Sequence, residues 1–129
     1  MEKRNFTEAS AYCRDQNAHL ADIESTRENM FVNFRLIPAI LNRSFPMEDV
    51  WIGYSDIESE GTWISERTNI TMKYENWLEG QPDQSNGNED CVEIFYSGKD
   101  NWNIKGKWND NSCNARRISI CKKSKIHQL

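Results

Sequence analysis

The sequence predicts an α+β domain in which two helices come first and short strands follow. Two observations carry this prediction. Helix-start signals and apolar residues at helical spacing lie before Pro38, whereas short apolar and aromatic pieces alternate with stretches rich in Gly, Asn, Asp and Ser from Val50 onward. A chain of 129 residues has the length of one domain, so we expect a single domain over residues 1–129.

The first helix is predicted to begin after Asn5. Asn5 and Glu8 have the spacing of a capping box, in which each side chain binds a backbone amide that the helix leaves free. Ala9, Tyr12 and Cys13 then form an apolar stripe at helical spacing.

The second helix is predicted to begin after Ser25, which forms another capping box with Glu28. An apolar stripe at helical spacing follows, made of Met30, Phe31 and Phe34. We expect Pro38 to limit this helix, because proline cannot donate the helical hydrogen bond.

The strands are predicted from short runs of apolar and aromatic residues at positions 50–54, 62–64, 91–96, 107–108 and 118–121. Between the second and third runs, residues 77–90 are nearly devoid of aliphatic side chains. A long polar loop inside a compact domain is usually functional or disordered. This loop is therefore the first place to look for a site.

Composition argues against several functions. The net charge is −4, from 20 acidic and 16 basic side chains, which does not suit a nucleic-acid partner. The longest apolar stretch, residues 37–41, is broken by Pro38, so no membrane insertion is expected. The histidines, His19 and His127, lie far from the acidic donors, and no catalytic triad pattern is evident. We therefore expect a binding protein, not an enzyme.

The cysteines predict a secreted or extracellular protein. Cys13, Cys91, Cys113 and Cys121 contain no C-x-x-C pair, so two disulfides are a better interpretation than a zinc site. The sequence alone leaves three pairings open. Glycosylation sequons begin at Asn5, Asn42 and Asn69. No signal peptide follows Met1, so either a leader has been removed or the chain is cut from a longer protein.

Oxygen donors gather between residues 81 and 110. Hard oxygen ligands without nearby His or thiolate suit calcium, although composition alone would also fit a solvated acidic loop. A bridge between Cys91 and Cys113 would bring two groups of these donors to one end of the domain. The donors are Gln81, Asp83, Glu89, Asp90, Asn109 and Asp110.

A series of motifs in order extends over most of the chain. They are Phe6-Thr7-Glu8-Ala9, residues 18–23, Trp51-Ile52-Gly53, Glu60-Gly61-Thr62-Trp63, Tyr74-Glu75-Asn76-Trp77, Gly80-Gln81-Pro82-Asp83, Glu89-Asp90-Cys91-Val92, Lys107-Trp108-Asn109-Asp110 and Ile120-Cys121. With these motifs the sequence resembles the C-type lectin-like domain. The resemblance implies two helices packed on small antiparallel sheets with long calcium-binding loops. The family's strand before the first helix is expected to be absent or truncated here.

The resemblance also implies a ligand set. It pairs Cys13 with Cys121 and Cys91 with Cys113, and it makes the peptide bond before Pro82 cis. Gln84 stands where an acidic ligand of the auxiliary site is expected. The implied ligands of a principal calcium are Gln81, Asp83, Glu89, Asn109 and Asp110, and those of an auxiliary calcium are Asp56, Glu60, Asp90 and the carbonyl of Glu89.

The Gln-Pro-Asp motif resembles that of family members that bind galactose or N-acetylgalactosamine. Sugar hydroxyls would complete the calcium shell and bond to Gln81, Asp83, Glu89 and Asn109. The stacking aromatic expected after the motif is missing, and Trp102 or Tyr96 could substitute. The expected partners are galactose-type glycans or glycoproteins, with oligomers supplying avidity. The alternative is a calcium-stabilised protein-binding module without sugar recognition.

Overall fold

The computed structural model describes residues 2–41, 48–82, 90–95 and 106–123. The helical segments come first, and all strands except a short β1 follow them, which confirms the predicted α+β class. Within the described ranges, no helix is long and apolar enough to cross a membrane. The elements are α1 (Phe6–Asp15), β1 (His19–Leu20), α2 (Thr26–Phe31), the π-helical η1 (Val32–Leu36), α3 (Ile37–Leu41), β2 (Val50–Ser55), β3 (Ile64–Ser65), β4 (Cys91–Phe95), β5 (Lys107–Asn111), β6 (Ile118–Ser119) and β7 (Cys121–Lys122).

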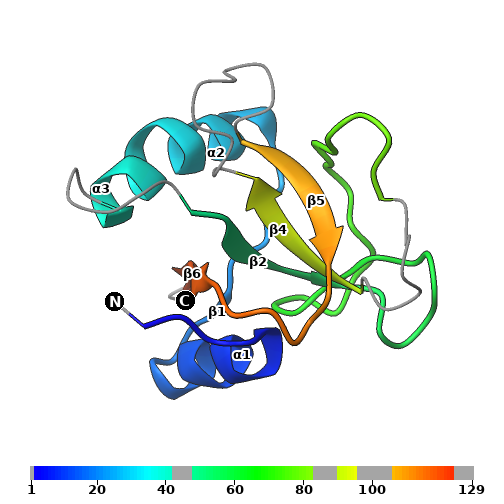
Figure 1. Ribbon diagram of the computed structural model, residues 1–129, viewed down its shortest axis with the longest axis horizontal. Helices are drawn as coiled ribbons and strands as arrows, with labels where there is room; N and C mark the ends of the chain where they lie inside the picture. The colour runs from blue at the N-terminus through cyan, green and yellow to red at the C-terminus, as the bar shows by residue number, and fades with distance from the viewer. Residues whose placement is uncertain (1, 42–47, 83–89, 96–105, 124–129) are drawn as a thin grey trace, which may run out of the picture.

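The main sheet has the strand order β3-β2-β4-β5, and β6 pairs with β2 off this path. All of these pairs are antiparallel except the pair of β6 with β2. A second, two-stranded sheet joins β1 to β7. In Figure 1, α1 lies on one side of the strands and the segment from α2 to α3 lies on the other.

The first helix forms as the capping box predicts. The Asn5 side chain accepts from the Glu8 amide at 2.8 Å, and the Asn5 amide donates to the Glu8 carboxylate at 3.1 Å. Phe6 is buried with its ring edge-on to Trp51, at a centroid distance of 5.7 Å. Of the predicted apolar stripe, Ala9 and Cys13 are buried and Tyr12 is not. Tyr12 is 39% exposed, and the Arg4 guanidinium lies 3.9 Å from its ring centroid.

The second helix begins at the predicted cap but differs in two respects. Met30, Phe31 and Phe34 are exposed, because the buried face carries Asn29, Val32, Asn33 and Ile37 instead. The helix also does not stop at Pro38. The π-helical segment η1 comes first, in which the Ile37 amide donates to the Val32 carbonyl, and Pro38 then lies in the first turn of α3. The missing N–H donor of a proline is tolerated in the first turn of a helix.

Two disulfides hold the domain in the pairing that the resemblance implies. Cys13 in α1 bonds to Cys121 in β7, and Cys91 at the start of β4 bonds to Cys113 just after β5. Before α1, Arg4 forms an isolated antiparallel bridge with Arg117. The start of the described chain and its last strands therefore lie side by side.

The central strand β2 approaches the segment after α1 very closely at Gly53. The Gly53 amide donates to the Ala21 carbonyl at 2.6 Å. A Cβ atom on Gly53 would overlap the carbonyl oxygen of Leu20. Only glycine fits here, because any side chain would displace backbone atoms.

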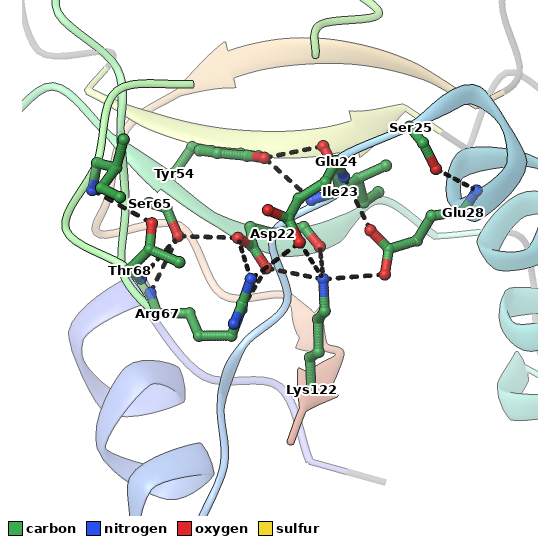
Figure 2. A network of polar contacts seen from close by, with 11 residues as sticks. Asp22, Ile23, Glu24, Ser25, Glu28, Tyr54, Ser65, Arg67, Thr68 and Lys122 are labelled. Atoms are coloured by element: carbon green, nitrogen blue, oxygen red, sulfur yellow. Dashed lines mark hydrogen bonds and ion pairs between the residues drawn. The ribbon is translucent and has the colours of Figure 1, made fainter. Parts of the chain in front are cut away.

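A polar network around Asp22 joins four separate segments, as Figure 2 shows. Asp22 is only 2% exposed, and its carboxylate accepts two hydrogen bonds from Arg67, at 2.8 and 3.2 Å. Lys122 in β7 lies 3.1 Å from the same carboxylate and 2.9 Å from Glu28. The Tyr54 hydroxyl meets both backbone groups of Ile23 beside this network. Two cations thus compensate one buried carboxylate.

Candidate calcium site

The candidate site is built at one end of the β4–β5 pair. In this antiparallel pair Asn109 faces Glu93, and Asp110 faces Val92. The disulfide from Cys91 to Cys113 closes the same end. Asp110 is fully buried and Asn109 is partly buried. The polar sequence Asn109-Asp110 is therefore held in a regular strand by its backbone pairing with β4.

The segment that ends at Gln81 is attached to β5 through Trp108. The Trp108 amide donates to the Asn76 carbonyl, and the Leu78 amide donates to the Trp108 carbonyl, both at 2.8 Å. The Gln81 amide then donates to Leu78 at 2.9 Å, after a turn in which Gly80 has a φ of 86°. These bonds hold the Gln81 segment beside the strand that carries Asn109 and Asp110.

The peptide bond between Gln81 and Pro82 is cis, as the resemblance implies. A cis bond shortens the Cα step, so the residues on either side of Pro82 can approach one ion. Gln81 is partly buried and Pro82 is exposed. Asp83, Glu89 and the aromatic candidates Trp102 and Tyr96 lie outside the described residues, as does Gln84.

The structure brings together the three carboxylates expected at the auxiliary site. Asp56, Glu60 and Asp90 each offer a carboxylate oxygen within 4.8 Å of the others. The Asp56 amide donates to the Asp90 carbonyl at 3.0 Å, which joins the end of β2 to the start of β4. Gly61 donates its amide to Asp56 Oδ2 at 2.8 Å, which folds the turn that carries Glu60 back toward this cluster.

Electrostatics at this cluster favour a cation. Burial raises the pKa of Asp56, and the neighbouring Glu60 carboxylate raises it further. Burial also raises the pKa of Asp90, with Asp56 adding to the effect. Among the described residues, no donor meets Asp90 Oδ1. A divalent cation would relieve this repulsion, because it favours the ionised carboxylates that a buried cluster otherwise disfavours.

The donors that are described suit calcium in kind. Carboxylate and amide oxygens from separate segments are its usual ligands, and it tolerates irregular geometry. Asn109 makes its contact with Glu93 through Nδ2, at 3.0 Å, so its amide oxygen Oδ1 is not the atom used in that contact.

Sequence reasoning missed Glu93, which lies directly across from Asn109. Glu93 is only 1% exposed and binds Asn109, Asn111 and Arg117. It lies between Val92 and Ile94, both buried, so the usual alternation of a strand would have turned it toward solvent. The signal that could have found it was a carboxylate inside an otherwise apolar and aromatic predicted run, residues 91–96.

This fold, with its disulfides and its oxygen donors, defines a class of non-enzymatic binding modules. A family profile described as the Lectin C-type domain matches residues 2–123, so the chain belongs to the C-type lectin domain family.

The chain is similar to proteins from vertebrates and molluscs. It is 33% identical to E-selectin of Sus scrofa over 121 residues, which is 93% of this chain and 23% of that protein. It is 37% identical to perlucin of Haliotis laevigata over 124 residues, which is 96% of this chain and 73% of that protein. The chain therefore spans about a fifth of the selectins and about three quarters of perlucin.

A solved structure shares the fold. The mouse scavenger receptor C-type lectin carbohydrate-recognition domain superimposes with a TM-score of 0.75 at 30% identity, covering 98% of this chain and 87% of that chain. This likeness confirms the expected C-type lectin fold, with helices packed on small antiparallel sheets.

Proposed function

We propose that the protein binds carbohydrate in a calcium-dependent manner, with terminal galactose or N-acetylgalactosamine as its ligand. The observation that carries the proposal is the attachment of the cis Gln81–Pro82 segment to β5 at Trp108, beside Asn109 and Asp110. That attachment holds the backbone of the Gln81 segment beside the strand that carries Asn109 and Asp110. The similar mouse scavenger receptor domain is a carbohydrate-recognition domain, which supports the same proposal.

The proposed principal calcium is held by Gln81, Asp83, Glu89, Asn109 and Asp110. An auxiliary calcium is held by Asp56, Glu60 and Asp90, with the carbonyl of Glu89. The carboxylate cluster described above supports the auxiliary ion, although Gln84 supplies no charge to it. Because β2 and β4 meet at Asp56 and Asp90, this second ion would also stabilise the loops around the first.

Sugar recognition needs no proton transfer in this proposal. Bound calcium supplies a coordination shell that two adjacent sugar hydroxyls can complete. Gln81, Asp83, Glu89 and Asn109 hydrogen-bond to the same hydroxyls, and carboxylates only accept whereas amides also donate. The placement of amide and carboxylate therefore selects the hydroxyl geometry. Trp102 is proposed to stack on the apolar face of the sugar.

The proposed setting is extracellular. Two disulfides suit an oxidising compartment. The proposed partners are galactose-type glycans or glycoproteins, and because single lectin sites are weak, oligomers would supply avidity.

The proposal is tested by chromatography of the chain on immobilised galactose and on immobilised mannose. We expect retention on galactose in the presence of calcium and elution by a chelator. Retention on neither resin by protein that still binds calcium would favour a protein-binding module instead. A protein that binds no calcium in calorimetry would remove the basis of the proposal.

The proposed specificity is tested by the double substitution Gln81→Glu with Asp83→Asn. It exchanges the positions of amide and carboxylate while it retains the net charge. We expect a shift of preference from galactose toward mannose, read as the ratio of retention on the two resins. An unchanged ratio in a double variant that still binds calcium would contradict the proposed role of these two side chains.

A further inference from the structure

Glu93 is a buried carboxylate that accepts hydrogen bonds from three residues. Asn109 Nδ2 donates to Oε2 at 3.0 Å, and Arg117 Nε donates to Oε1 at 3.0 Å. Asn111 Nδ2 lies 3.3 Å from both oxygens. With 1% of its side chain exposed, Glu93 has these three residues in place of water.

This arrangement is not explained by stability alone. Removing the Glu93 carboxylate from water costs free energy, and an ion pair with a buried member often stabilises no more than well-packed apolar residues do. Asp49 adds an unfavourable negative charge near Glu93. What an apolar pair could not supply is a fixed orientation for the amides that donate to the carboxylate.

The orientation matters most at Asn109. The side-chain amide is planar, so fixing its NH2 group on Glu93 also fixes the direction of its Oδ1 atom. A flipped amide would place Oδ1 against the Glu93 carboxylate, oxygen against oxygen, and would lose the hydrogen bond. A charged acceptor therefore selects one of the two amide orientations far more strongly than a neutral group would.

We infer that Glu93, held by Arg117, is a positioning residue for calcium binding: it orients the Asn109 amide so that Oδ1 is presented to the principal calcium. The inference rests on the proposed function, since it takes Asn109 as a ligand. It adds a residue from β4 that does not itself contact the ion or the sugar. Asn111 donates to the same carboxylate.

The test is calcium titration of the folded protein by calorimetry, with the variant Glu93→Gln. A neutral amide at this position can donate as well as accept, so it no longer prefers one orientation of Asn109. We expect calcium affinity at the principal site to fall by about tenfold or more, the usual effect of removing a group that orients a metal ligand. The binding step that Asn109→Ala weakens identifies the principal site.

A double-mutant cycle separates positioning from a general structural effect. If Glu93 acts through Asn109, then Glu93→Gln has no further effect on calcium affinity once Asn109 is replaced by Ala. The matched control is Asp22→Asn, which also neutralises a buried carboxylate paired with cations, but in a different network. We expect it to lower the unfolding temperature in chelator and to leave calcium affinity unchanged.

The outcomes are distinguishable. Wild-type affinity in Glu93→Gln, or an equal loss in the Asn109→Ala background, would overturn the positioning role while leaving the proposed calcium site intact. Wild-type calcium affinity in Asn109→Ala would overturn both the positioning role of Glu93 and the proposed role of Asn109 as a calcium ligand. If Glu93→Gln does not fold, Arg117→Lys tests the same contact, because it retains the positive charge and loses the Nε donor. A loss of calcium affinity that disappears in the Asn109→Ala background supports the inference. Unchanged calcium affinity in Arg117→Lys contradicts it.

Discussion

At the scale of single residues, the buried carboxylates of this protein have two kinds of surroundings. Asp22 and Glu93 are each met by cations and neutral donors. Asp56 instead lies among other carboxylates, with Glu60 and Asp90 close by. In the first kind a cation lies beside the carboxylate, although burial still raises the pKa of Glu93. In the second kind the carboxylates repel one another, which favours protonation or a bound cation. The surroundings therefore separate structural carboxylates from candidate ligands.

The pH dependence of stability should reveal the role of Asp22. Burial raises the pKa of Asp22, but hydrogen bonds and charges from Arg67 and Lys122 outweigh burial, and the net shift is downward. Because its pKa is lower in the folded state, ionised Asp22 stabilises the fold fully at pH values above about 4, the ordinary pKa of an aspartate. This stabilisation is lost as the pH falls through the folded-state pKa.

We therefore expect Asp22→Asn to reduce the free energy of unfolding by about 3 kcal/mol at pH 7, because it removes the buried carboxylate that Arg67 and Lys122 share. The difference from wild type should shrink as the pH falls below about 4. Urea denaturation of wild type and Asp22→Asn at pH 7 and pH 3 measures the loss of unfolding free energy and its change with pH. Glu24→Gln, which alters an exposed member of the same network, is the control and should change little. An effect of Asp22→Asn that does not vary with pH would contradict this account.

At the scale of elements, the close approach of β2 to Leu20 determines how tightly the main sheet packs on the segment after α1. We expect Gly53→Ala to reduce the free energy of unfolding by about 3 kcal/mol, since backbone atoms must move to admit the methyl group. Guanidinium denaturation checks this value.

The matched control for Gly53 is Gly61→Ala. Gly61 has a φ of 82° but open space where a Cβ would lie, so its cost is backbone strain alone, about 1 kcal/mol. Equal losses of unfolding free energy in Gly53→Ala and Gly61→Ala would show that the overlap with the Leu20 carbonyl is relieved without a loss of stability.

Two strands that carry their own apolar pattern were predicted well. Strands β2 and β4 coincide with predicted runs to within a residue, because their side chains are buried on the sheet. Strand β5 extends three residues beyond the predicted run, through Asn109 to Asn111. Asn and Asp have low strand propensity, so the sequence does not mark these residues as a strand. Their backbone pairing with β4 holds them in the strand. Pro38 was misread because a first-turn proline ends no helix.

The candidate site could be predicted only in part. The resemblance pointed to Gln81, Asn109 and Asp110, and it also named Asp56, Glu60 and Asp90, whose carboxylates lie within 4.8 Å of one another. Whether the principal ligands meet at one ion stays a prediction, since Asp83 and Glu89 lie outside the described residues. Glu93 could not be found from composition, because its role depends on a neighbour 16 positions away.

At the scale of the whole molecule, the first and last segments are joined to each other. Arg4 and Arg117 exchange two backbone hydrogen bonds, at 2.8 and 2.9 Å, and β1 pairs with β7. Figure 1 shows the blue start of the chain on the left and the green segment before Pro82 on the right. The segment that ends at Pro82 and the N-terminal segment joined to Arg117 therefore lie on opposite sides of the domain.

The disulfide between Cys13 and Cys121 has a mechanical consequence. Its two cysteines are separated by 108 positions, so nearly all of the domain lies inside the loop that it closes. Tension applied through the two ends of the chain would pass from one end to the other through this covalent link. Only the segments outside it could be drawn out, and the loops proposed to hold calcium and sugar would carry no direct load while the domain is pulled.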